Sequence, residues 1–86
     1  MNFSELYSLQ AVAKEWRENS GSDQQKTSGV VLIWANEVYG WKNELRDPNQ
    51  ERPGAYAVLP DGTVYKAIGG NDYDGAEHFM MVGGGA

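Results

Sequence analysis

The sequence predicts an α+β domain in which one N-terminal helix packs on a four- or five-stranded antiparallel sheet. Residues 3–19 have the periodicity of an amphipathic helix, and the rest of the chain holds short runs rich in β-branched and aromatic residues. The connections between these runs are too short for the crossovers that parallel strands need. With 86 residues, the chain is expected to form a single small domain.

The helix is expected over residues 3–19. Asn2 can cap its first turn, and Glu5, three residues further on, completes the pattern of a capping box. The segment 20–28 is small and polar, so it is expected to be a flexible connector. The apolar side of the helix is formed by residues at three- and four-residue steps, namely Phe3, Leu6, Leu9, Ala13 and Trp16.

A β-hairpin is expected next, with strands over residues 29–35 and 38–43 joined by a two-residue turn at 36–37. A helix is the alternative for this stretch, because four apolar residues also recur there at helical steps: Trp34, Val38, Trp41 and Leu45. The β-branched run at its start and the glycine at position 40 favour the hairpin.

A second hairpin is expected around the turn Pro60-Asp61-Gly62. Proline presets the turn, aspartate favours it, and glycine accepts a positive φ. This turn joins residues 54–59 to residues 63–68. The other segments are expected to be an exposed loop, a second loop, a last strand and a frayed tail, over residues 45–53, 69–76, 77–82 and 83–86 respectively.

Strand pairing sorts the side chains of the first hairpin onto two faces, because successive side chains of a strand point to opposite sides. A turn at 36–37 places Trp34 opposite Tyr39. The large face then collects Val30, Leu32, Trp34, Tyr39 and Trp41. The small face collects Val31, Ile33, Ala35, Val38 and Gly40.

The second hairpin divides in the same way. One side carries a row of alanines together with one tyrosine: Ala55, Ala57, Ala67 and Tyr65. The other side carries Tyr56, Val58, Val64 and Ile68. A helix needs a close approach, so it is expected on the small face and the alanine row. This arrangement leaves Tyr56 and Val58 beside Trp34 and Trp41.

The aromatic face is the candidate functional surface, because one helix covers only one face of a sheet whose strands are apolar on both sides. Three aromatic side chains would hide roughly 500 Å² in an interface. We therefore expect a non-enzymatic protein–protein interaction module, which forms a homodimer or binds a heterologous protein through Trp34, Tyr39, Trp41, Tyr56 and Val58. Two alternatives leave no free face: the loop 44–53 folds over it, or the helix sits there with Trp16 against Trp34.

Two other functions fit the same residues. The aromatic face can form a pocket for a small ligand, closed by a loop to which Asn71, Asp72, Tyr73 and Asp74 would contribute. The acidic chain can also act as an inhibitor or decoy of a host protein, of the kind that phages and mobile elements carry.

Composition argues against several other classes. The chain has no cysteine, one histidine and a net charge of −5, so no cofactor, metal or nucleic acid is expected. His78 is expected in the last strand with no nucleophile in a suitable context, and no catalytic residue is assigned. The apolar runs are too short to cross a membrane. The absence of cysteine and of a secretory signal fits a cytoplasmic location.

Overall fold

The computed structural model describes residues 2–84 and confirms the α+β arrangement. A long helix and a short one precede five strands, and a single 3₁₀ turn lies between the second and third strands. The elements are α1 (Phe3–Glu18), α2 (Asp23–Thr27), β1 (Val30–Trp34), β2 (Glu37–Lys42), η1 (Pro48–Gln50), β3 (Tyr56–Val58), β4 (Val64–Ile68) and β5 (His78–Gly83).

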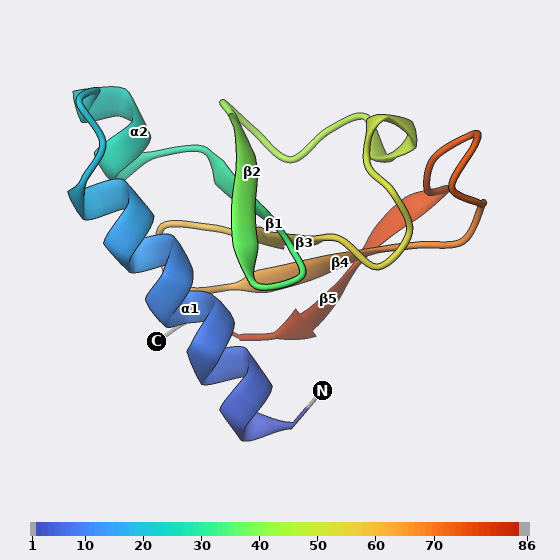
Figure 1. Cartoon of the computed structure of the whole chain (residues 1–86), viewed down its shortest axis with the longest axis horizontal. Helices are drawn as coiled ribbons and strands as arrows, with labels where there is room; N and C mark the ends of the chain where they lie inside the picture. The colour runs from blue at the N-terminus through green and yellow to red at the C-terminus, as the bar shows by residue number, and fades with distance from the viewer. Residues whose placement is uncertain (1, 85–86) are drawn as a thin grey trace.

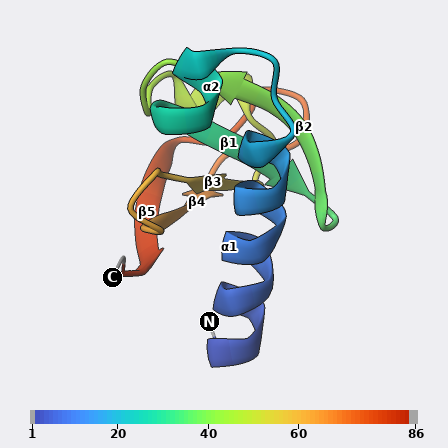
Figure 2. The same ribbon diagram turned by 90° about the vertical axis from the view of Figure 1, so that its left-hand side faces the viewer.

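The five strands form one sheet in the order β2-β1-β3-β4-β5, and every neighbouring pair is antiparallel. Figure 1 shows α1 lying across one side of this sheet, and Figure 2 shows it as a separate layer. We call this side of the sheet the helix side and the opposite side the loop side. The strands β2 and β5 form the two edges.

The start of α1 confirms Asn2 as the N-cap, while the Glu5 carboxylate meets the side chain of Asn2 and not the backbone N–H that a capping box uses. The side chain of Asn2 accepts a hydrogen bond from the backbone N–H of Glu5 at 2.8 Å and donates one to its carboxylate. The segment 20–28 differs from the flexible connector that was expected, because it contains α2. Ser22 caps this helix by accepting a hydrogen bond from the N–H of Gln25.

The turn of the first hairpin lies one residue earlier than expected. It consists of Ala35 and Asn36, whose φ angles are 52° and 65°, and it pairs Trp34 with Glu37. Positive φ at both central residues gives a turn whose twist matches the strands. Asparagine tolerates this conformation better than glutamate does, which favours Asn36 over Glu37 as the second central residue.

A β-bulge in β2 then changes the face on which Trp41 lies. Ile33 pairs with Val38 and Leu32 pairs with Gly40, so Tyr39 is the extra residue between them. After the bulge, Trp41 is opposite Val31 instead of Leu32. The prediction that Trp41 shares a face with Trp34 is therefore wrong.

The helix packs on the side that carries Val31 and Ile33, as expected. Leu9 and Ala13 of α1 are buried against these strand residues. The same side also carries Val58 and Val64 of the second hairpin, with Trp41 and Tyr56 packed around them. The expectation that α1 covers the alanine row is wrong, because pairing across the sheet places Ala55, Ala57 and Ala67 on the loop side.

The loop side is covered by the chain itself, mainly by residues 43–55. Leu45 packs against the buried side chains of Val30, Leu32 and Ala57. Glu51 in the same loop is only 4% exposed. The alternative in which this loop folds over the sheet is thus the one that the structure shows.

A charged cluster fastens this loop to β2. The Glu51 carboxylate accepts a hydrogen bond from the Tyr39 hydroxyl at 2.6 Å and lies 2.6 Å from Nζ of Lys42. The Glu51 carbonyl accepts the backbone N–H of Ala76 at 2.9 Å, which ties the loop 69–77 to the same place. Burying charge in this way is tolerated because the carboxylate is both paired and hydrogen-bonded.

The second hairpin and the C-terminal segment are close to the prediction. The turn at 60–62 is confirmed by hydrogen bonds from Leu59 N to Thr63 O and from Gly62 N to Leu59 O. Gly83, expected in a frayed tail, instead belongs to β5, while residues 85–86 of that tail lie outside the described residues. None of the described helices has the length and apolar character to cross a bilayer.

Candidate functional site

The structure divides the predicted interface residues between the two sides of the sheet. Trp41, Tyr56 and Val58 lie on the helix side, where they pack around α1. Trp34 and Tyr39 lie on the loop side, and the hydroxyl of Tyr39 is bound to Glu51. These five residues therefore do not form one continuous aromatic face.

Trp34 has a polar neighbour that sequence reasoning did not anticipate. The guanidinium of Arg52 lies over its ring, 4.1 Å from the ring centroid, and Trp34 is 36% exposed. The same guanidinium is 3.2 Å from the carboxylate of Asp72. Arg52 thus links one predicted interface residue to one predicted loop residue.

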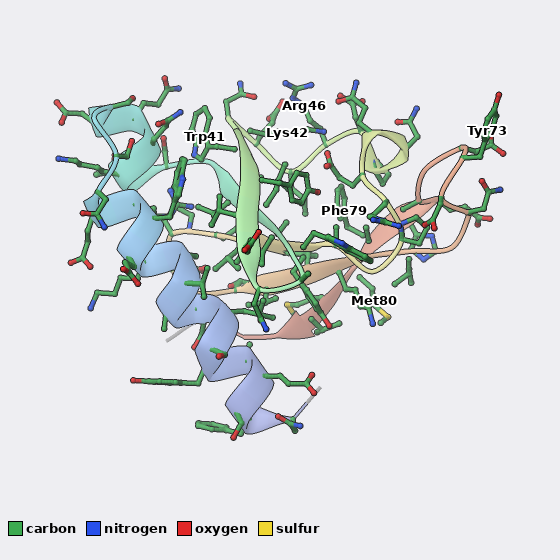
Figure 3. All side chains as sticks on the ribbon, in the orientation of Figure 1. Trp41, Lys42, Arg46, Tyr73, Phe79 and Met80 are labelled. Carbon is green, nitrogen blue, oxygen red and sulfur yellow. The ribbon has the colours of Figure 1, made fainter. Side chains whose placement is uncertain are left out.

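The loop residues form a compact turn. The side-chain oxygen of Asn71 accepts the backbone N–H groups of Tyr73 and Asp74 at 2.9 and 2.7 Å. Tyr73 is 96% exposed and points away from the sheet at the tip of the loop (Figure 3). Among residues 2–84, no group of three or more acidic or histidine side chains is arranged to hold a metal ion.

The more promising surface is the outer edge of β5, which among residues 2–84 pairs with β4 alone, on its inner side. Met80 and Met81 are 47% and 59% exposed and point to opposite sides of the sheet. Figure 3 places Met80 at this lower edge. His78 lies in the last strand, as the sequence predicted, and is its first residue. A strand edge with unpaired backbone groups is a template for an added strand.

The first turns of α1 extend beyond this edge. Figures 1 and 2 both show the N-terminal end of the helix projecting past β5. Leu6 packs closely on Gly83, so that a Cβ at position 83 would collide with the Leu6 side chain. This contact fixes the point where α1 crosses β5. Two aromatic side chains on the projecting part, Phe3 and Tyr7, are 84% and 68% exposed. We call Phe3, Tyr7, Met80 and Met81 the β5 edge surface.

The other half of β5 is open on the helix side. His78 pairs with Ile68 and Met80 pairs with Lys66, and α1 reaches β5 at the Gly83 end instead. The ammonium of Lys66 lies 5.6 Å from the centroid of the Tyr56 ring. The edge therefore has an overhanging apolar helix at one end and an uncovered sheet at the other.

Sequence reasoning missed this surface, although two signals were present. Phe3 and Tyr7 widen the apolar side of α1 beyond the stripe that buries Leu9 and Ala13. Adjacent methionines in a strand must place one apolar side chain on each face. That β5 is an edge strand depends on strand order, which the sequence alone does not determine.

No family model matches this chain, and no solved structure matches it. Among curated proteins, beta-lactamase OXA-48 from Klebsiella pneumoniae is similar, with 31% identity over 70 residues. The match covers 74% of this chain and 26% of that protein. The chain thus spans about a quarter of the length of the curated relative that it matches.

Proposed function

We propose that this protein is a small non-enzymatic interaction module that forms a homodimer through the β5 edge surface. The observation that supports the proposal is an unpaired strand edge flanked by four exposed apolar side chains. Strand edges of this kind are usually shielded by charges, prolines or bulges that discourage pairing. In β5 the register with β4 shifts at Val82, which is a bulge near the Gly83 end, but methionines occupy the centre of the strand.

A second copy fits this edge because the two halves of the edge complement each other. If two β5 strands pair antiparallel about a two-fold axis, the Gly83 end of each strand meets the His78 end of the other. The projecting Phe3 and Tyr7 of one copy then lie over the uncovered Met80 of its partner. The same contact forms twice, and the result is one continuous sheet of two copies.

The similarity to a β-lactamase does not supply a better candidate. In class A β-lactamases and penicillin-binding proteins, the nucleophilic serine belongs to a Ser-x-x-Lys motif, and this sequence contains no such motif. Thr63 and Lys66 have that spacing, but Lys66 lies in β4 and Thr63 directly precedes it. Residues three apart share a face of a helix and point to opposite faces of a strand.

The first test replaces both methionines of the edge with charges. We expect Met80→Lys/Met81→Lys to yield monomers, because lysines on each side of a strand edge repel their copies across the two-fold axis. Both side chains are largely exposed, so the fold is expected to survive. The control is Tyr73→Lys, which charges a still more exposed aromatic residue away from the edge. The mass in solution is measured by light scattering on a sizing column.

The second test separates the edge from the aromatic face. Phe3→Ser/Tyr7→Ser is expected to weaken the dimer, whereas Trp34→Ala is expected to leave it intact. The opposite result would return the interface to the loop side of the sheet. A mass equal to one chain at every concentration would show that the protein does not self-associate, and the proposal would be wrong.

A further inference from the structure

A cavity of about 720 Å³ lies between the second half of α1, Lys26 of α2 and the turn that joins β3 to β4. Figure 2 looks onto this side of the molecule, where α1 and α2 lie. Its volume is within the range of small-molecule sites in proteins. None of the residues of the β5 edge surface lines the cavity.

The charges around the cavity differ from those of the rest of the chain. Three of the seven Lys and Arg residues line it, namely Lys14, Arg17 and Lys26. Among residues 2–84, none of these three forms an ion pair, whereas Lys42, Arg46 and Arg52 each do. Two carboxylates, Glu18 and Asp61, also line the cavity, so the rim keeps an excess of one positive charge in a chain of net charge −5.

Arg17 is the most firmly held charged side chain of the cavity. It is 7% exposed, and its two terminal nitrogens donate to the carbonyl oxygens of Gln25, Ser28, Gly29 and Val58. These contacts hold the guanidinium in one orientation. Guanidinium has five N–H donors, and the Nε–H of Arg17 has no partner among the described residues. A fixed cation with a remaining donor is suited to a carboxylate.

Part of the cavity lining is apolar. It comes from Ala13 of α1 and from Val58, Leu59 and Pro60 around the end of β3. Asp61, which also lines the cavity, already accepts the backbone N–H of Thr63 at 2.9 Å, which keeps its carboxylate in the turn. The cavity thus combines unpaired cations with an apolar wall.

We infer that this cavity binds a small organic carboxylate with an apolar chain. The carboxylate lies toward Arg17, Lys14 and Lys26, and the apolar chain lies along Leu59 and Pro60. Binding of this kind combines a charge-assisted hydrogen bond with burial of apolar surface.

The test is a titration of the complete chain with octanoate, followed by backbone amide NMR shifts. Saturable shifts are expected in residues 10–18 and 58–62. The double variant Lys14→Ala/Lys26→Ala is expected to weaken octanoate binding by about fivefold. Lys66→Ala, which removes a cation far from the cavity, is the matched control and is expected to bind as the original chain does.

The neutral analogue octanamide separates charge recognition from apolar burial. In the original chain we expect octanamide to bind more weakly than octanoate. In the double variant we expect the two compounds to bind with equal affinity. Absence of saturable shifts up to about 10 mM octanoate would overturn the inference. Equal binding of octanoate and octanamide, or shifts located elsewhere, would also overturn it, because the cations of the cavity would then play no part.

Discussion

At the scale of single residues, the Glu51 carboxylate is the most consequential charge in the molecule. It lies beneath its own loop, with the Tyr39 hydroxyl and the Lys42 ammonium each 2.6 Å away. Lys42 also donates to the carbonyl of Arg46 and the side chain of Gln50, so one ammonium holds several points of the loop. The cluster explains how a loop with few apolar residues stays on the sheet.

We expect Glu51→Gln to lower the free energy of unfolding by about 3 kcal/mol, because it leaves the half-buried Lys42 ammonium without its counter-charge. The double variant Lys42→Met/Glu51→Leu removes both charges and is expected to recover much of that loss. Urea denaturation measures both. A Glu51→Gln variant as stable as the original chain would show that the ion pair contributes nothing to loop packing.

The same cluster predicts a loss of stability at alkaline pH. Burial raises the pKa of Tyr39, and so do the hydrogen bond to Glu51 and its negative charge. A tyrosine pKa that is higher in the folded chain than the ordinary value of about 10 stabilises the fold below that pH. The contribution is lost as the pH rises above it, because only the unfolded chain then ionises freely. Denaturation midpoints above pH ~10 should therefore fall less steeply in Tyr39→Phe.

At the scale of elements, Arg17 joins α1 to three other segments. Its four acceptors belong to α2, the segment before β1, and β3. We expect Arg17→Met to destabilise the fold by about 3 kcal/mol, because buried carbonyls lose charged partners. Lys14→Met on the exposed side of the same helix is the control. Hydrogen exchange of the α2 amides should accelerate in Arg17→Met alone; unchanged exchange would mean that α2 is held by its own caps.

The helices and strands also show which structural features the sequence alone could predict. Capping, helical periodicity and the turn Pro60-Asp61-Gly62 act locally, and each was predictable. The β-bulge at Tyr39 was not predicted: Gly40 directly follows it, and a glycine inside a strand can mark a bulge, but which residue is left unpaired depends on the register with β1. That one residue moves Trp41 to the helix side and divides the predicted aromatic face. The cover over the loop side was predicted as an alternative, with the loop 44–53 folding over the sheet, and the sequence could not select it because Glu51 meets its partners through contacts between distant segments.

At the scale of the whole molecule, the chain's own segments cover the sheet on both sides except at the His78 end of β5, and four of the seven exposed large hydrophobic residues belong to the β5 edge surface. Association at that border must overcome repulsion, because each copy carries a net charge of −5. The radius of gyration is 12.0 Å. At 0.01 M salt the screening length is about 30 Å, which is longer than this radius, so the charges of two docked copies repel one another across the whole dimer. At 0.15 M salt the screening length is about 8 Å, and most of this repulsion is screened.

We therefore expect the dimer to become tighter as salt increases, with a dissociation constant several-fold lower at 0.15 M than at 0.01 M salt. Analytical ultracentrifugation across this range measures it. The variant Glu5→Gln, which removes one negative charge from the projecting end of α1, should bind more tightly than the original chain at low salt and equally at high salt. A dimer that weakens with salt would have to be held by ion pairs between the copies, and an apolar strand edge could not account for it.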